Sequence, residues 1–260
     1  MTSRIKYPKL TIVTIVYNAQ NYIEQTIKSI VNQTYKNIEY IVVDGASNDR
    51  TMEIIKRYEK SIDKIISEPD RGIYDAMNKS IKLATGDFIW FINAGDEVYD
   101  SKTVENIFKN YDNEDVLYGA MQLINEDGSM ASLFTVPKKL TYKDFIYGMV
   151  VSHQAIIIKK DIVSPYNLEY KVVSDHDWII SALKRAKKIK NTQMTISKYL
   201  LGGFSDKQFY KAWKEKLTIM LRQYGKVAYL LNILLFIKAI LKKNIKSLMM
   251  RIKDENNSKC

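Results

Sequence analysis

The sequence predicts an α/β fold with a mostly parallel sheet flanked by helices, and two observations support this prediction. Up to about residue 100, apolar β-branched runs alternate with segments whose apolar residues recur at helical spacing. Two of these runs, "LTIVTIVY" (10–17) and "IEYIVVDGAS" (38–47), are nearly continuously apolar before they break at polar turns, as expected for parallel strands covered on both faces. The hydrophobic content of 46% over 260 residues is typical of a globular protein.

Each predicted strand is followed by a predicted helix, which indicates right-handed βαβ units. Residues 21–33, "NYIEQTIKSIVNQ", place apolar residues on one helical face, and residues 49–60, "DRTMEIIKRYEK", predict the second helix. A third unit runs from a strand in 64–70 to a helix in 73–84, with Gly86 expected at its C-terminal cap.

A fourth strand is expected in "DFIWFINAGD" (87–96), and three of these strands then end in acids. The acids are Asp44, Asp70 and Asp96. Each acid alone would be explained as a turn or helix-cap residue. Ligands of open α/β sheets bind at the carboxyl ends of the strands, so three acids at that edge indicate a site.

The middle of the chain predicts three further strands and a helix. Residues 115–124 and 131–136 are expected to pair around the turn "NEDGS", and residues 152–160 predict another strand. The helix is expected in "VVSDHDWIISALKRAK" (172–187), which starts with an acidic cluster. Acids at a helix start are ordinarily dipole partners, so a catalytic role for them needs a second argument.

The C-terminal region carries most of the net charge of +11. A charged helix is expected in 206–224, followed by an amphipathic segment at 226–253 whose lysines interleave with Ile, Leu and Met. This pattern predicts an in-plane helix on an anionic membrane, while packing on the main domain or a dimer contact stay open as alternatives. We expect a cytoplasmic protein at the inner face of the membrane, without disulfides, since Cys260 is the single cysteine. Nucleic-acid binding is disfavoured because no aromatic stacking platform accompanies the lysines.

The motifs resemble those of family 2 glycosyltransferases. Residues 10–51 resemble the N-terminal signature of the family, and "EPDRGIYDAMNKSIKLATGDFIWFINAGD" (68–96) is similar to the bacterial branch that builds exopolysaccharides, capsules and lipopolysaccharide. The resemblance implies a GT-A fold, which is a Rossmann-like, mostly parallel sheet flanked by helices. It implies a nucleotide-sugar half at about 1–110 and an acceptor half at about 111–205, with 206–260 left as a basic helical extension.

The resemblance also implies an inverting transfer from a nucleotide-sugar donor, with UDP-sugars favoured, to a lipid-linked or oligosaccharide acceptor. Mg²⁺ or Mn²⁺ is the implied cofactor, and Asp96 is its implied ligand. In the family pattern, a second aspartate that contacts the ribose stands where this chain has Gly95, and Asn93 is the expected neutral substitute. The turn residues Asn93, Ala94 and Gly95 are all expected near the donor. Donor contacts are further implied for Thr14, Val16, Tyr17, Asp44, Asp70, Arg71, Asn78 and Lys79.

The implied general base is Asp175, with Asp177 as the alternate if the alignment shifts. His153 is expected to line the donor-sugar or acceptor pocket, and Ser205 to contact the diphosphate. Two other functions stay open at this point. One is a nucleotide-sugar-binding protein with impaired catalysis, indicated by Gly95, and the other, weaker one is a basic nucleic-acid-binding protein. The donor sugar, the acceptor, the linkage and the oligomeric state are not predicted.

Overall fold

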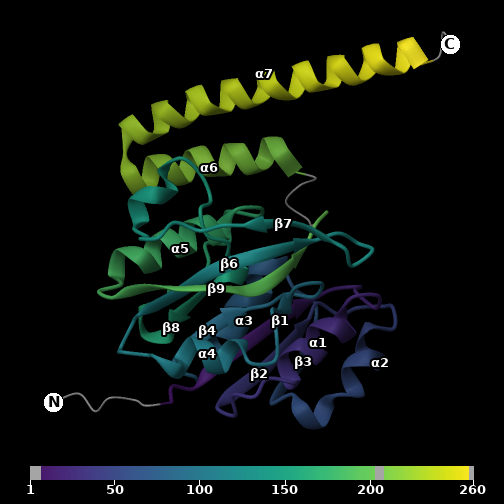
Figure 1. Cartoon of the computed structure of the whole chain (residues 1–260), viewed down its shortest axis with the longest axis vertical. Helices are drawn as coiled ribbons and strands as arrows, with labels where there is room; N and C mark the ends of the chain where they lie inside the picture. Colours follow the sequence, from purple (N-terminus) through teal and green to yellow (C-terminus); the bar gives the residue numbers. More distant parts are fainter. Residues whose placement is uncertain (1–6, 203–207, 258–260) are drawn as a thin grey trace. The chain divides into compact units, whose positions relative to one another are not determined.

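The computed structural model describes residues 7–202 and 208–257, with side chains as far as residue 241. The chain divides into two compact units, Met1–Lys207 and Gln208–Cys260. The first unit contains a nine-stranded sheet with helices against it (Figure 1), and the second contains two helices.

The first part of the sheet is parallel, as the sequence predicts. Its strands are β1 (Leu10–Val16), β2 (Ile38–Asp44), β3 (Lys64–Ser67) and β4 (Phe88–Phe91). They lie in the order β3-β2-β1-β4, and every neighbouring pair among them is parallel. The helices between them are α1 (Ile23–Val31), α2 (Thr51–Lys56) and α3 (Ile73–Leu83), with a 3-10 turn η1 (Glu59–Ser61) after α2.

Gly86 does not cap α3, so this prediction is wrong. The cap position after Leu83 belongs to Ala84, which has extended backbone angles. A Cβ on Gly86 would lie 2.6 Å from the Thr11 hydroxyl oxygen and 2.8 Å from the Lys9 carbonyl oxygen. Glycine is therefore required here because the chain passes very close to β1, and not because a helix ends.

The second part of the sheet is mixed. It contains β5 (Glu97–Val98), β6 (Val116–Ile124), β7 (Met130–Phe134), β8 (Ile156–Lys159) and β9 (Ile189–Leu200). Strand β8 joins the two parts by pairing antiparallel with both β4 and β6. The remaining elements are α4 (Thr103–Lys109), α5 (Ser174–Arg185) and the 3-10 turns η2 (Tyr142–Ile146), η3 (His153–Ala155) and η4 (Lys160–Ile162).

Alternate residues of the parallel strands build two cores, one on each face of the sheet. On one face, Ile12 and Trp90 belong to a cluster that includes apolar residues of α1, α2 and α4. On the other face, the Phe91 ring lies 5.8 Å from the ring of Tyr166 and 5.7 Å from that of Trp178 on α5. The active-site candidates of α5 are therefore carried on a helix packed against β4.

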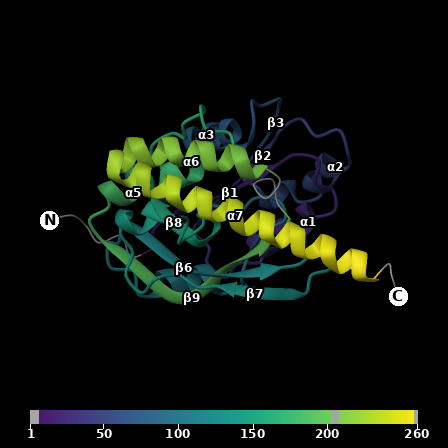
Figure 2. The same cartoon turned by 90° about the horizontal axis from the view of Figure 1, so that it is seen from above.

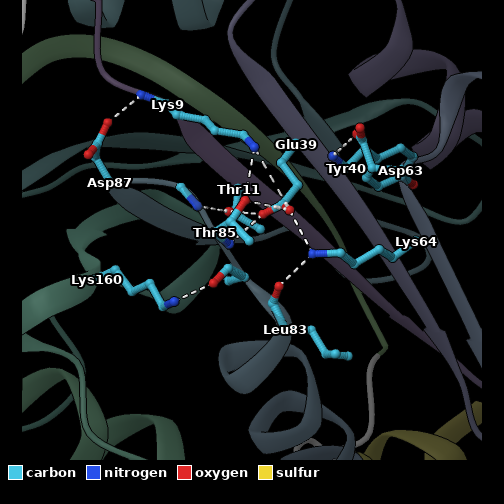
Figure 3. A network of polar contacts seen from close by, with 12 residues as sticks. Lys9, Thr11, Glu39, Tyr40, Asp63, Lys64, Leu83, Thr85, Asp87 and Lys160 are labelled. Carbon is cyan, nitrogen blue, oxygen red and sulfur yellow. Dashed lines mark hydrogen bonds and ion pairs between the residues drawn. The ribbon is translucent and has the colours of Figure 1, made fainter.

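A buried acid holds the amino-terminal ends of β1 and β2 together (Figure 3). Glu39 accepts hydrogen bonds from the Thr11 hydroxyl at 2.7 Å and from the backbone N–H and hydroxyl of Thr85 at 2.7 and 2.8 Å. Lys64 donates to it at 2.9 Å. Burial raises the pKa of Glu39, but these bonds lower it by more, to about 2.

The C-terminal unit is a pair of helices, α6 (Phe209–Tyr224) and α7 (Lys226–Asn257), which lie side by side (Figure 2). Gly225, with φ of 84°, makes the turn between them. The rings of Trp213 and Phe236 stack at 5.2 Å across the pair. None of the described helices is both long enough and apolar enough to cross a bilayer.

Candidate active site

Four parallel strands bring their carboxyl ends to one edge of the sheet. Asp44 is the last residue of β2, whereas Asp70 and Asp96 lie in the turns that follow β3 and β4. The gathering of three aspartates at one edge, which the sequence predicts, is thus present in the structure.

A tight turn after β4 carries Asp96. The backbone N–H of Asp96 donates to the carbonyl of Asn93 at 2.9 Å, which closes a four-residue turn. Gly95, the third residue of this turn, has φ of 100°. A type II turn requires a positive φ at its third position, where glycine is favoured. A Cβ at position 95 would also lie 3.1 Å from the Leu200 side chain, so the aspartate of the family pattern does not suit this turn.

The turn is held from both sides. The Thr26 hydroxyl on α1 accepts from the backbone N–H of Gly95 at 3.0 Å and donates to the carbonyl of Asp96 at 2.8 Å. On the other side, the backbone N–H of Ala94 donates to the Ile15 carbonyl of β1 at 3.1 Å. The position of Asp96 is therefore set by a helix and by the central strand.

The Asp96 carboxylate is buried among neutral donors. Nε2 of Gln154 donates to Oδ2 at 3.0 Å, and the backbone N–H of Leu200 donates to Oδ1 at 3.4 Å. Lys198 pairs with the neighbouring acid, Glu97, at 2.9 Å. Burial raises the pKa of Asp96 to about 6, against the lowering effect of the Gln154 hydrogen bond.

A divalent cation fits this environment. A buried carboxylate gains from a positive charge beside it, and its hard oxygens suit Mg²⁺ or Mn²⁺. Oδ1 of Asn93, in the same turn, is buried and has no hydrogen-bond partner among the described residues. The described residues include no group of three or more His, Cys, Asp or Glu side chains that could hold a metal. Magnesium sites often use one or two carboxylates with water and phosphate oxygens, so Asp96 is compatible with such a site.

Asn93, His153 and Asp175 form a continuous line of contacts. Nδ2 of Asn93 lies 3.1 Å from Nε2 of His153, and Nδ1 of His153 lies 3.1 Å from Oδ2 of Asp175. His153 and Gln154 are consecutive residues of η3. Two neighbouring side chains of one 3-10 turn thus hold the two carboxylates, with His153 on Asp175 and Gln154 on Asp96.

Asp175 lies in the first turn of α5. The Tyr74 hydroxyl is 3.2 Å from its Oδ1, and the backbone N–H of His176 donates to the same oxygen at 3.0 Å. Burial raises the pKa of Asp175, but its contacts with neighbouring groups, the hydrogen bond with His153 foremost, lower it by more. The net result is a pKa below the ordinary value, so this carboxyl is ionised at neutral pH.

Asp177, the alternate base, lies in a different environment on the same helix. It is buried and interacts electrostatically with Lys184. The contact with His153 is made by Asp175. The geometry therefore favours Asp175 over Asp177 as the base.

Tyr17, Gly45 and Asp70 lie together at the sheet edge. A Cβ on Gly45 would lie 2.7 Å from Oδ2 of Asp70 and 3.4 Å from the Tyr17 ring. Tyr17 is 63% exposed. An exposed ring beside a carboxylate offers a stacking surface and a hydrogen-bond acceptor, which suits a nucleobase or a ribose.

Asp44, beside this group, is fully buried. Its carboxylate accepts from the backbone N–H of Ser47 at 3.0 Å, from the Ser47 hydroxyl, and from the Ser67 hydroxyl at 2.6 Å. The burial of Asp44 and its bonds to two serines therefore do not favour the predicted contact with a nucleotide.

Thr14 and Val16 lie inside β1, with side chains in the interior. The Thr14 hydroxyl donates to the Ile92 carbonyl at 2.8 Å, and Val16 belongs to the core cluster. Donor contacts predicted for these two residues are thus limited to backbone atoms, and Tyr17 supplies the exposed side chain of this segment.

The residues predicted to reach the phosphates have protein partners. Arg71 lies 3.2 Å from Asp75, with its side chain 78% exposed, and Lys79 lies 2.7 Å from Glu68. The Arg71 side chain is exposed and its ion pair is therefore weak, so a phosphate can compete for it. Lys79 is partly buried and also donates to the Pro69 carbonyl at 3.1 Å, so it is held more firmly. Ser205, also predicted to reach the diphosphate, lies outside the described residues.

Asn78 has a structural position. Its Nδ2 donates to the Tyr166 carbonyl at 3.0 Å, and its Oδ1 accepts from the Tyr166 backbone N–H at 2.7 Å. The Tyr166 ring stacks between those of Tyr74 and Trp178, with centroids 5.3 and 4.9 Å away. Both ends of the Asn78 amide are thus bonded to the backbone of Tyr166, which does not favour the predicted donor contact for Asn78.

Comparison with known proteins identifies the family. The model of Glycosyl transferase family 2 matches residues 11–152, which is more than half of the chain. The chain belongs to glycosyl transferase family 2. A PGL/p-HBAD biosynthesis glycosyltransferase of Mycobacterium bovis is 26% identical over 219 residues, covering 78% of this chain and 83% of that protein. An uncharacterized glycosyltransferase of Mycobacterium tuberculosis is 28% identical over 193 residues, covering 67% of this chain and 69% of that protein.

Solved structures confirm the GT-A fold predicted for this glycosyltransferase. TarS from S. aureus in complex with UDP superposes with a TM-score of 0.63 at 22% identity, covering 85% of this chain and 68% of that chain. A mannosyltransferase from Pyrobaculum calidifontis in complex with GDP-Man and Mn²⁺ superposes with a TM-score of 0.60 at 15% identity. The match covers 83% of this chain and 64% of that chain.

Four residues of the glycosyltransferase site were not assigned from the sequence. They are Thr26, Tyr74, Gln154 and Tyr166. Thr26 could have been noticed in the sequence, because it is a polar residue on the otherwise apolar face of α1. Gln154 directly follows His153. The contacts of Tyr74 and Tyr166 join distant segments, so no local pattern predicts them.

Proposed function

We propose that this glycosyltransferase moves a sugar from a nucleoside diphosphate donor to an acceptor hydroxyl with inversion at the anomeric carbon. One observation carries the proposal. The consecutive residues His153 and Gln154 hold the carboxylates of Asp175 and Asp96, so an ionised base and a candidate cation site are built around a single turn.

Asp175 acts as the general base. As the acceptor hydroxyl attacks the anomeric carbon, its proton passes to the Asp175 carboxylate, and the bond from the sugar to the diphosphate breaks on the opposite face. Since the pKa of Asp175 lies below its ordinary value, the carboxylate is ionised and available when the acceptor arrives.

Asp96 would hold Mg²⁺ or Mn²⁺. When bound, such a cation supplies Lewis-acid stabilisation of the charge that develops on the leaving diphosphate. Asn93 offers its unpartnered Oδ1 to a ribose hydroxyl, and Tyr17 offers its exposed ring to the base. Arg71 and Lys79 are the cations we assign to the diphosphate.

A UDP-sugar is the donor we favour. The superposed TarS structures are complexes with UDP and with UDP-GlcNAc, whereas the superposed mannosyltransferase binds GDP-Man. A carboxylate such as Asp70 beside Tyr17 can accept from the N3–H of uracil or from ribose hydroxyls.

The acceptor is proposed to be lipid-linked or an oligosaccharide in surface polysaccharide synthesis, reached from the inner face of the membrane. Helix α7 supports this proposal with an exposed apolar stripe. Its members are Val227, Leu230, Leu234, Ile237 and Leu241, which are 50% to 82% exposed and recur every three or four residues. Lys226 precedes the stripe, Lys238 lies within it, and further lysines follow it in the sequence. An apolar stripe flanked by lysines suits an anionic bilayer surface, where it would raise the local concentration of a lipid-bound acceptor.

Replacement of the two candidate bases separates their roles. Asp175→Asn is expected to lower kcat by about 10²- to 10⁴-fold, the usual contribution of a general base, because an amide cannot take the acceptor proton. Asp177→Asn is expected to retain transfer in the fraction that folds. The measurement is sugar transfer per folded protein, with donor binding as the control. Equal loss of activity in both variants would remove the assignment of Asp175.

A further inference from the structure

Both ring nitrogens of His153 contact protein groups. Nδ1 lies 3.1 Å from Oδ2 of Asp175, and Nε2 lies 3.1 Å from Nδ2 of Asn93. The side chain is 11% exposed. With its two polar atoms turned towards other residues, His153 is better placed to hold them than to contact a substrate directly.

The chemistry of these neighbours fixes the proton on the ring. An ionised carboxylate only accepts hydrogen bonds, so Nδ1 of His153 carries the proton that points to Asp175. The amide nitrogen of Asn93 only donates, so Nε2 is the acceptor. His153 is then neutral, with one proton directed at the base. The opposite amide orientation would place Oδ1 against Nε2 and require a proton on both nitrogens.

The oxygen end of the Asn93 amide makes no hydrogen bond within the described part of the chain. Its Oδ1 is buried and unpartnered among the described residues, in the turn that carries Asp96. Buried polar atoms are nearly always hydrogen-bonded, so this oxygen suits a hydroxyl or N–H of a bound ligand. A ligand that donates to Oδ1 also keeps Nδ2 directed at His153, because both atoms belong to one planar amide.

The other titratable groups around Asp175 hold it less directly. The Tyr74 hydroxyl has one proton and lies closer to a backbone carbonyl, at 2.8 Å, than to Asp175 Oδ1, at 3.2 Å. The interaction between Tyr166 and Asp175 is electrostatic. The Nε2 atom of His176 hydrogen-bonds the carbonyl of Phe145 in η2. His153 is therefore the side chain that is placed to orient Asp175.

We propose that His153 is a positioning residue that orients the base Asp175 in response to occupancy of the donor site at Asn93. The proposal rests on the glycosyl transfer proposed above. Donor binding fixes the Asn93 amide, the amide fixes the proton of His153 on Nδ1, and this proton holds the Asp175 carboxylate for the acceptor. The donor then binds before the acceptor is activated, which limits proton abstraction to the complex that can transfer a sugar.

Two variants at position 153 test the positioning role by steady-state transfer. His153→Phe removes both contacts and is expected to lower kcat by about 10²-fold, the lower end of what a positioned base contributes, with donor KM changed less than about threefold. His153→Gln, whose amide can donate to Asp175, is expected to recover part of the loss. An unchanged kcat in His153→Phe would overturn the proposal, and so would a rise in donor KM alone, which would indicate direct substrate contact.

The dependence of kcat on pH shows whether His153 positions Asp175 or only supports the structure around it. The His153 hydrogen bond lowers the pKa of Asp175, so its removal raises that pKa and moves the acidic limb of kcat to higher pH. His176→Phe is the matched control, since the chain has two histidines and the ring of His176 bonds a backbone carbonyl instead. We expect a larger shift of the limb in His153→Phe than in His176→Phe, because the His153 side chain makes the hydrogen bond to Asp175. Equal shifts in the two variants, or no shift in His153→Phe, would contradict the assignment.

Nitrogen NMR of the two imidazole rings gives a readout that does not depend on activity. His153, assigned by its loss in His153→Gln, is expected to be the neutral Nδ1–H tautomer in the wild type, and this state should become more populated when donor is added. An Nε2–H tautomer or a doubly protonated ring at neutral pH would overturn the proposal even if no acceptor is found. Failure of the wild type to bind or transfer any nucleotide sugar would instead remove the proposed function.

Discussion

At the scale of single residues, the turn from Asn93 to Asp96 explains why this chain lacks the second acid of the family pattern. Gly95 has φ of 100° and lies against Leu200, so a side chain at this position would strain the backbone and meet a neighbour. The absence of an aspartate at position 95 follows from the shape of the turn. It does not by itself indicate a loss of catalysis.

Gly95→Ala tests this explanation. A Cβ in the left-handed region costs about 1–2 kcal/mol, and here it also displaces the turn that carries Asp96. We expect a lower Tm together with weaker donor binding. Gly128→Ala is the matched control, because Gly128 has φ of 80° and no atom within 4 Å of an added Cβ. It should lower Tm and leave donor binding unchanged. Donor affinity that survives in Gly95→Ala would show that the turn does not position the donor site.

At the scale of elements, the exposed stripe of α7 makes a separate prediction. Replacing Leu230, Leu234 and Ile237 with serine removes apolar area and keeps every lysine. Burial of apolar side chains at the bilayer boundary contributes to binding along with charge, so we expect the triple variant to lose flotation with vesicles that contain anionic lipid. A variant lacking residues 226–260 should behave in the same way. Flotation equal to wild type in both would contradict membrane binding by α7.

The elements that the sequence predicts are those with a strong local pattern. Strands β1 and β2 are continuous apolar runs, and α1 and α3 show helical periodicity, so each could be located without knowledge of its partners. Strand β9 is different, because "IKNTQMTISKYL" mixes polar and apolar residues and is stabilised by pairing with β6 and β5. Strand β5, with two residues, has no pattern of its own.

The same distinction holds within the site. Asp96 and Asp175 could be located because each lies at the end of a predicted element, where motifs are recognisable. The contacts made by the two ends of the Asn78 amide, and the contact between Ser67 and Asp44, could not be anticipated, because they join segments far apart in the sequence. Such contacts depend on tertiary packing, which a single sequence does not display.

At the scale of the whole first unit, a polar network at the amino-terminal ends of the strands is expected to contribute to stability. Glu39 ties β1, β2 and the segment before β4 together, and its pKa is lowered from 4.5 to about 2. A lowered pKa contributes stability that is present above pH 4.5 and is lost as the pH falls from 4.5 towards 2.

Glu39→Gln is therefore expected to reduce the free energy of unfolding at pH 7 by on the order of 2 kcal/mol and to narrow the gap to wild type as the pH falls to 3. Urea unfolding at the two pH values measures this. The control is Glu53→Gln, which removes an exposed carboxylate paired with Arg50 and Arg57 and should change stability little. A gap that stays constant between pH 7 and pH 3 would show that the Glu39 charge is not what holds the network.

We propose above all that Asp96 and its turn form a cation-dependent site for a nucleotide sugar. The most direct measurement is thermal unfolding of the wild type, Asp96→Ala and Asn93→Ala with UDP-, GDP- and dTDP-sugars, with and without Mn²⁺. A ligand that binds only the native state raises Tm. We predict that at least one nucleotide sugar, a UDP-sugar first, raises the Tm of the wild type only with Mn²⁺. The shift should be smaller in Asn93→Ala and absent in Asp96→Ala. Equal shifts in all three proteins, or no shift with any donor, would contradict the account.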